Sequence, residues 1–223
     1  MSNKLKKQSN DYVHATFKGL VSSIPFAGGA LSVLFDTVFS APIDKRKKEW
    51  LLSLDEAIKE LTIKVDGLTP ESLRENEVFI SVAMQASQIA LKNHQKEKLE
   101  ALSNAVFNAV IMTSINENKA LIFTRIIDEI TPLHIQLLSF LDNPDRYEKL
   151  LQDKTGKNMF THYPGNINIF EETFPEMLAE KELIEQVVKE LYVKGFVFHD
   201  SIHGSKGRVT TNYGREFLNF ITK

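Results

Sequence analysis

The chain has 223 residues, of which 43% are hydrophobic and 25% are charged, values typical of a globular protein with a sizeable core. Its formal net charge of −2 lacks the basic excess that dedicated nucleic-acid-binding domains carry. The sequence contains no cysteine, which excludes disulfides and thiolate metal sites and fits the reducing cytoplasm.

Residues 19–43 form the most distinctive stretch, a long apolar run that carries one charge, Asp36. From residue 30 to 41 polar side chains recur at every fourth position, as in an amphipathic helix with a wide apolar face. Pro25 and the Gly28-Gly29 pair favour a turn before this helix. The pattern predicts an apolar helical hairpin over residues 13–41, with each arm too short to span a bilayer.

Four consecutive basic residues follow the hairpin, and Trp50 comes just after them. A basic cluster beside an apolar face is typical of a helix that lies on an anionic membrane surface. The same pattern is typical of a helix with one solvated side and one side in a protein core, so the sequence leaves both interpretations open. The residues that would contact a membrane are Ile24, Phe26, Leu31, Leu34, Phe35, Val38, Phe39, Lys45, Arg46, Lys47 and Lys48.

Helical periodicity continues to residue 142 and predicts a helical bundle over residues 1–142. A stripe from Trp50 to Val65 predicts one helix, and Gly67 is expected to end it. Thr69-Pro70 predicts the start of a second helix that continues to about Ala90. Further helices are expected from His94 to about residue 116, over residues 121–130, and from Thr131-Pro132 to Leu141.

The pattern changes after residue 142. Residues 143–169 are polar, with scattered glycine and proline, and are expected to form a linker or loop. Two helices, two short strands (196–199 and 207–210, on either side of Gly204) and a final helix are expected after it. This order predicts a winged-helix-like domain over residues 170–223 that packs with helix 131–141. The expected fold is therefore mainly α: a helical bundle with an apolar hairpin, then a winged-helix-like α+β domain.

The predicted winged helix raises the question of DNA binding. Its recognition helix would carry Glu182, Glu185 and Glu190 against two lysines, and a net negative helix is poorly suited to phosphate contacts. The residues near the wing that would favour such contact are Lys206, Arg208 and Arg215. The charge pattern argues against nucleic acid as the partner.

No pattern of catalytic residues is present. His199 and His203 flank the predicted turn without sharing a helix face, which favours surface histidines over a metal site. The chain has no glycine-rich phosphate loop after a strand and no nucleophile elbow. We therefore expect a protein that is not an enzyme and uses no cofactor, metal or small-molecule substrate.

Three segments between residues 70 and 142 resemble the bacterial Abi-alpha (abortive infection alpha) family and its uncharacterised relatives. They read Asn76-Glu77-x-Phe79, then Lys98-Leu99-x-Ala101-Leu102-x-Asn104-Ala105-Val106-x-Asn108, then Ile127-Asp128-Glu129-Ile130-Thr131-Pro132-Leu133-His134-x-x-Leu137-Leu138. The resemblance implies a role in bacterial or prophage-encoded defence and supplies no catalytic residues. The N-terminal apolar hairpin departs from the family pattern.

Together these observations favour a non-enzymatic abortive-infection-like protein that acts through membrane or protein contact of its hairpin. The expected partners are an anionic membrane surface, a protein or a second copy of the chain. The expected location is the cytoplasm, at the inner face of the plasma membrane. The alternative is a winged-helix regulator or adaptor that docks DNA or a partner protein.

Overall fold

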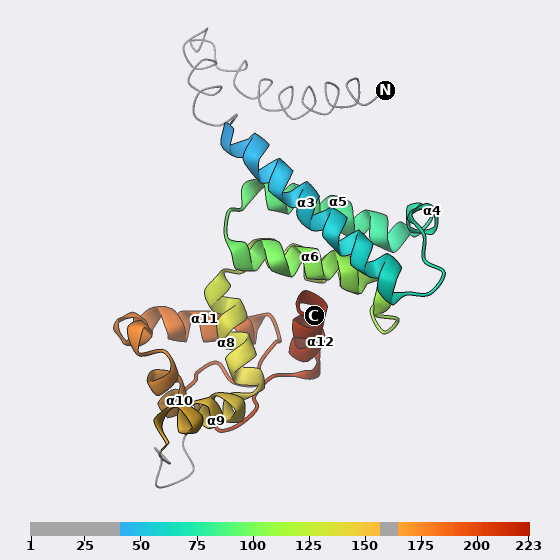
Figure 1. Ribbon diagram of the computed structural model, residues 1–223. Coiled ribbons are helices and arrows are strands. Elements are labelled where there is room, and N and C mark those ends of the chain that lie inside the picture. The colour runs from blue at the N-terminus through green and yellow to red at the C-terminus, as the bar shows by residue number, and fades with distance from the viewer. Residues whose placement is uncertain (1–40, 157–164) are drawn as a thin grey trace. The chain divides into compact units, whose positions relative to one another are not determined.

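The computed structural model describes residues 41–156 and 165–223, and their regular secondary structure is entirely helical (Figure 1). The predicted mainly α character is confirmed for these residues. The hairpin predicted over residues 13–41 lies outside the described residues, apart from Ala41. The chain divides into two units, residues 1–49 and 50–223.

Helix α3 spans Ala41–Lys64 and begins in the first unit. Within the second unit the predicted apolar stripe faces the core, because Trp50, Ala57 and Leu61 are each at most 3% exposed. The indole Nε1 of Trp50 donates a hydrogen bond of 2.8 Å to Ser87 Oγ on α5. Trp50 is thus a core anchor with its one polar atom satisfied.

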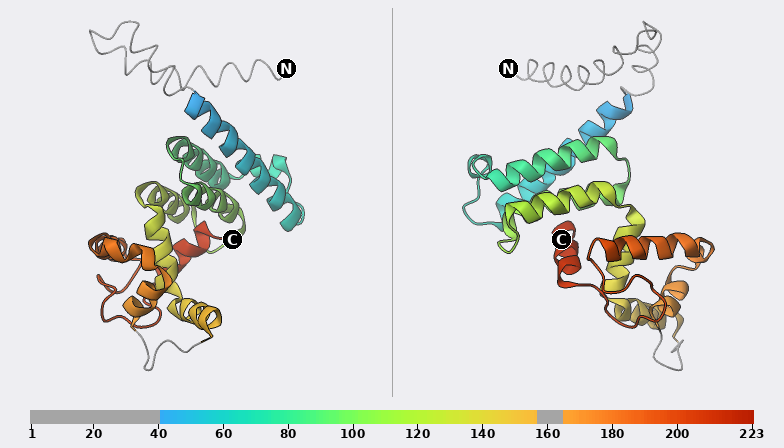
Figure 2. Two further views of the ribbon diagram at one scale, coloured as in Figure 1. Left: turned by 60° about the vertical axis from the view of Figure 1, so that its left-hand side comes forward. Right: turned by 180° about the vertical axis from the view of Figure 1, so that it is seen from behind.

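Four helices follow α3: α4 (Pro70–Arg74), α5 (Glu77–Lys92), α6 (Lys96–Ile111) and α7 (Glu117–Glu129). The single helix predicted from Pro70 to about Ala90 is divided into α4 and α5. The division occurs because Asn76 caps α5, where its Oδ1 accepts a hydrogen bond of 3.0 Å from Phe79 N–H. Helices α5, α6 and α7 pack on one another, and Figure 2 shows α5 and α6 side by side.

The remaining helices are α8 (Pro132–Asp142), α9 (Pro144–Thr155), α10 (Asn166–Thr173), the 3₁₀ helix η2 (Pro175–Glu180), α11 (Lys181–Val193) and α12 (Asn212–Ile221). Helix α12 joins the core of the preceding helices. The Phe123 ring of α7 lies 5.3 Å from the Phe217 ring and 5.7 Å from the Phe220 ring, both on α12. Helices on both sides of residue 142 therefore belong to one hydrophobic core.

Helix α9 occupies much of the segment 143–169, where a linker or loop was expected. Asn143 caps it through a 3.3 Å hydrogen bond from Arg146 N–H to Asn143 Oδ1, and Pro144 takes the first helical position. The helix is largely polar and has few apolar side chains. Its partly buried Tyr147 and Leu151 pack against the core, with the Tyr147 ring 5.2 Å from that of Phe140.

The predicted strands of the wing are wrong. In the described part of the chain no strand forms, and the two segments meet in one antiparallel bridge between Val197 and Thr210. The ladder stops because the Val209 N–H donates instead to the Leu141 carbonyl at the end of α8, at 3.1 Å. The loop is thereby attached to α8, and the domain is helical where an α+β arrangement was predicted.

Gly214 lies where α12 approaches the bridged segment closely. A Cβ at this position would lie 2.2 Å from the Phe196 carbonyl oxygen, a distance that no side chain tolerates. The Gly214 N–H caps the start of α12 by donating to Thr211 Oγ1 at 2.9 Å. Glycine is therefore required for α12 to approach the bridged segment this closely.

The end of α12 is held by two buried asparagines of α6. Asn104 Nδ2 donates to the Ile221 carbonyl at 3.0 Å. Asn108 Nδ2 lies within 3.0 Å of the carbonyls of Asn219, Phe220 and Thr222. These carbonyls have no intrahelical donors, so the two amides cap the C-terminus of α12. Asn104 and Asn108 thus have a folding role.

Candidate functional site

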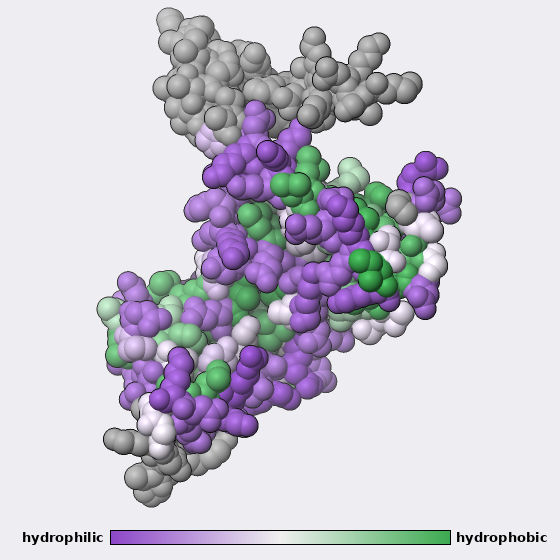
Figure 3. Space-filling view, in the orientation of Figure 1, coloured by the Kyte–Doolittle hydropathy of each residue, from purple (hydrophilic) through white to green (hydrophobic). Residues whose placement is uncertain are grey.

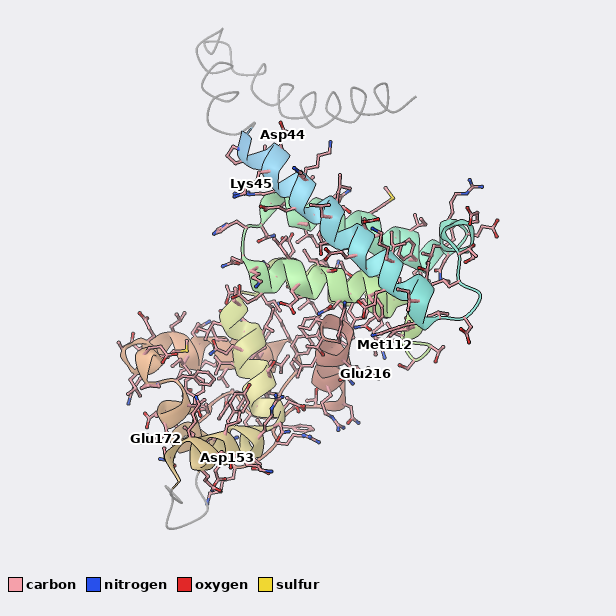
Figure 4. All side chains as sticks on the ribbon, in the orientation of Figure 1. Asp44, Lys45, Met112, Asp153, Glu172 and Glu216 are labelled. Atoms are coloured by element: carbon pink, nitrogen blue, oxygen red, sulfur yellow. The ribbon has the colours of Figure 1, made fainter. Side chains whose placement is uncertain are left out.

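The predicted membrane-contact residues divide at the boundary of the described chain. Ile24, Phe26, Leu31, Leu34, Phe35, Val38 and Phe39 lie outside the described residues. The basic members lie on the first turns of α3, where Lys45 and Lys48 are exposed and Arg46 and Lys47 are half-buried. Figure 4 shows Lys45 beside Asp44 at this end of the helix.

The charge at the start of α3 is predominantly positive. Four cations, residues 45–48, stand against the carboxylates of Asp44 and Glu49. Lys45 Nζ lies 3.8 Å from Glu49 Oε1, and both side chains are more than half exposed. Arg46 and Lys47 also have interaction partners. Asp44 lies in the first turn of α3, where a negative charge complements the helix dipole, and the four cations follow in the second turn.

The solvent-facing side of α3 also carries apolar residues. Leu51 is 53% exposed and Leu52 is 55% exposed. Figure 3 shows hydrophilic side chains along the visible face of α3, with apolar ones between them.

The predicted nucleic-acid residues do not form a basic patch. Arg208 is bound to the end of α8, where its Nε donates to the Asp142 carbonyl at 2.7 Å. Arg215 donates to Asn212 Oδ1 on its own helix. Lys206 is exposed in the loop that carries Arg208. Arg208 therefore acts as a cation at the C-terminus of α8, a stabilising position.

Helix α11, the predicted recognition helix, is held by internal contacts. Its apolar side is buried: Ile184, Val187, Val188 and Leu191. Glu190 Oε2 lies 3.0 Å from His134 Nε2 on α8, and Lys194, just after α11, forms an ion pair of 2.6 Å with Glu129. Since these charges are used within the fold, the helix presents little positive charge to a phosphate backbone.

The most buried ionisable cluster lies where α7 ends and α8 begins. His134 is 4% exposed, and its Nδ1 accepts the Thr131 N–H at 3.2 Å. That bond places the ring proton on Nε2, which donates to Glu190 Oε2 at 3.0 Å. Burial lowers the pKa of His134 below its usual value, although Glu190 acts in the opposite direction. Both ring nitrogens are engaged, so the histidine serves as a structural connection.

Lysine side chains surround the same end of α7. Lys98 is 5% exposed and its Nζ donates to the Asp128 carbonyl at 2.9 Å. Lys92 Nζ lies 3.6 Å from an Asp128 carboxylate oxygen. Burial lowers the pKa of Lys98, while the Asp128 carboxylate raises it. These cations stabilise the negative end of the α7 dipole.

The two histidines near the predicted turn lie on an open surface. His199 and His203 line a shallow depression of about 200 Å³, and His203 Nε2 lies 3.3 Å from Glu185 Oε1. Over residues 41–156 and 165–223, no group of three or more histidine, aspartate or glutamate residues is placed to hold a metal ion.

Sequence reasoning missed a surface groove between α5 and α7. It has a volume of about 400 Å³ and is lined by Gln85, Asn118, Leu121, Ile122 and Arg125. The four α7 residues have the spacing i, i+3, i+4, i+7 of a single helix face. This spacing was the available signal, but the expected helix began at residue 121 and so omitted Asn118.

No family model, curated protein or solved structure matches this chain. Among the described helices, none combines the length and apolar character that crossing a bilayer would require.

Proposed function

We propose that this chain is a non-enzymatic, abortive-infection-like defence protein that binds anionic membrane surfaces through the start of α3 and the apolar segment before it. The observation that carries the proposal is the basic cluster at residues 45–48. Four consecutive cations near the start of α3 concentrate positive charge, which attracts an anionic surface.

The energetics favour contact through two elements acting together. A basic residue near an anionic membrane contributes about 1 kcal/mol, so the cluster alone gives weak association that salt screens. Each aliphatic or aromatic side chain removed from water adds about 1.5–3 kcal/mol. Leu31, Leu34, Phe35 and Val38, on the predicted apolar face, are the residues expected to supply this second contribution.

The defence role rests on the resemblance of residues 70–142 to the Abi-alpha family. The asparagines and histidine of the resembling segments dock α12 and join α8 to α11. These are scaffold roles, and they support placing the effector activity elsewhere in the chain. The basic start of α3 is the region best suited to that activity.

Liposome flotation of the full-length protein tests the membrane contact. The test variant changes Lys45, Arg46, Lys47 and Lys48 to glutamine. A matched control changes four exposed lysines of the second unit to glutamine, with the same loss of charge: Lys96, Lys149, Lys154 and Lys189. We expect wild type and control to float with phosphatidylglycerol vesicles and the test variant to remain in the lower fractions. Equal flotation of all three proteins would refute membrane contact by this cluster.

A phage-plating assay tests the defence role. A bacterial host that expresses wild type should show reduced plating of some phages and slowed growth at high expression. The Lys45–Lys48 glutamine variant should lose both effects at equal protein level, whereas the matched control should keep them. Defence that survives in the test variant would separate the activity from membrane contact.

An adaptor role is the second candidate, and exposed apolar residues at the end of α11 and just beyond it favour this role. Val193 is 83% exposed and Phe198 is 63% exposed. Exposed aromatic and aliphatic side chains are more typical of a protein contact than of a DNA contact. Changing both residues to serine should leave flotation unchanged, and it would abolish function only if the adaptor role is correct.

A further inference from the structure

The outer face of α7 is self-complementary. We propose that the groove between α5 and α7 binds the same groove of a second copy of this chain, with the two α7 helices packed antiparallel across a two-fold axis. The proposal goes beyond membrane contact and involves residues of the second unit only.

The spacing of the groove residues is the first argument for an antiparallel pair of α7 helices. Asn118, Leu121, Ile122 and Arg125 occupy one face of α7 and line the groove. In an antiparallel pair centred between residues 121 and 122, Leu121 of one copy lies opposite Ile122 of the other. Asn118 then lies opposite Arg125. Each contact is repeated by the two-fold axis, as an isologous interface requires.

The charged residues at the two ends of the groove face, Glu117 and Arg125, are the second argument for the antiparallel pair. Arg125 is exposed, and no hydrogen bond or ion pair joins its guanidinium to another described residue. Glu117 is exposed at the start of the same helix and likewise lacks such a bond within the described chain. In the antiparallel pair, Glu117 of one copy lies one helical residue, about 1.5 Å along the axis, from the level of Arg125 of the other. Two Arg–Glu pairs result, one on each side of the apolar centre.

The apolar centre of the face, formed by Leu121 and Ile122, is the third argument for this interface. Ile122 is 38% exposed, and Leu121 beside it is partly buried. A partner helix would cover both side chains while leaving the charged pairs at the rim, which is the usual anatomy of an interface. The contact involves one helix face, so it belongs with small, reversible interfaces and not with obligate ones. We expect a dissociation constant of micromolar order.

Sedimentation equilibrium of the full-length protein over a concentration series tests the proposal by charge exchange. Wild type should show a reversible monomer–dimer equilibrium. Arg125→Glu and Glu117→Arg should each raise the dissociation constant at least about tenfold, since each places like charges together. The double variant should return within about threefold of wild type, because the pairs re-form with reversed sign. Arg146→Glu, an exposed arginine on α9, is the matched control and should change nothing.

A cross-linking experiment tests the register. The chain has no cysteine, so Ile122→Cys introduces a single thiol close to the proposed two-fold axis. Mild oxidation should link two copies through this residue, because its two Cα atoms would lie within disulfide range. Lys149→Cys on α9 should remain largely unlinked at the same concentration.

Three results would overturn the proposal. The first is a wild-type protein that is monomeric at every concentration, as expected if another molecule occupies the groove. The second is a dimer that Arg125→Glu leaves intact. The third is a double variant that stays monomeric although each single variant folds, as shown by an unchanged circular dichroism spectrum and melting temperature.

Discussion

Two clusters of basic residues lie at helix ends in this molecule, and they differ in which end they occupy. Lys92, Lys98 and Lys194 gather around the last turn of α7, where the helix dipole is negative. The cluster at residues 45–48 follows Asp44 in the second turn of α3, near the positive end of the helix dipole. The first arrangement stabilises its helix, and the second gives its helix no such stabilisation.

The contacts around α7 identify charges that serve folding. Each lysine there contacts Asp128 or Glu129, so these residues are accounted for by the fold. The sequence does not show that these three lysines meet, because they lie in separate segments, whereas residues 45–48 are consecutive. The position along the helix also differs between the two clusters.

Replacing Lys98 should have the largest effect on stability. Lys98→Ala removes a buried, charged hydrogen bond to the Asp128 carbonyl and leaves that carbonyl unsatisfied. We expect a loss of about 2 kcal/mol in the free energy of unfolding, measured by urea denaturation. Lys96→Ala, at an exposed lysine two residues earlier on α6, should cost less than about 0.5 kcal/mol. Equal costs for both variants would show that the α7 cluster does not stabilise the fold.

The junction beside Lys98 should make stability depend on pH. Burial lowers the pKa of His134, so the unfolded chain binds a proton first as the pH falls. Stability should therefore be fully present above about pH 6.5 and decline as the pH falls from there toward the lowered pKa. The groups that face the ring are Glu190, Lys194 and Lys98.

His134→Gln is the control for this pH dependence, because glutamine at the same position can also accept the Thr131 N–H. The variant should flatten the stability curve between pH 5 and 7, as followed by thermal melting at a series of pH values. A wild-type protein whose stability stays constant or rises as the pH falls through this range would contradict a buried, neutral His134.

Removing the basic cluster of α3 should change stability only slightly. Unlike Lys98→Ala, it should not lower the free energy of unfolding. Changing Lys45–Lys48 to glutamine removes cations from a positive helix end, so stability should stay equal or rise by less than about 1 kcal/mol. Urea denaturation of the full-length variant measures it. A loss of more than about 1 kcal/mol would mean that these residues serve the fold in the way that Lys98 does.

Changing the loop cations should have the smallest effect on binding. Lys206→Ala combined with Arg208→Ala should leave affinity for duplex DNA low and nearly unchanged, as measured by fluorescence anisotropy, because Arg208 already contacts Asp142. Tight binding by wild type at physiological salt, lost in the double variant, would support the regulator hypothesis.

The helices were predictable where local chemistry specifies their ends. Thr131-Pro132 marks the start of α8, and Thr69-Pro70 marks the start of α4, since the cap and the proline both act within one turn. The helix predicted from Pro70 to about Ala90 ran through Asn76, although the segment Asn76-Glu77-x-Phe79 was itself noted as opening a helix, which is where α5 begins. Helix α9 was missed because its packing depends on Phe140, which belongs to another helix.

The wing and the groove depended on contacts that are distant in sequence. The segments around Val197 and Val209, on either side of Gly204, were predicted to be strands, but the Val209 N–H bonds to Leu141 and ends the ladder. Arg208, a candidate for DNA contact only under the alternative hypothesis, faces the end of α8. The sequence did not reveal the groove on α7, because its lining also includes Gln85 of α5.

The salt dependence of membrane binding tests the central claim most directly. Full-length wild type and the Lys45–Lys48 glutamine variant would be titrated with phosphatidylglycerol vesicles at rising NaCl concentration. Wild type should bind more tightly at low salt and lose affinity as the Debye length shortens from about 10 Å at 0.1 M to about 3 Å at 1 M. The variant should bind weakly at every salt concentration. Equal affinities and equal salt slopes for the two proteins would contradict a membrane role for the start of α3.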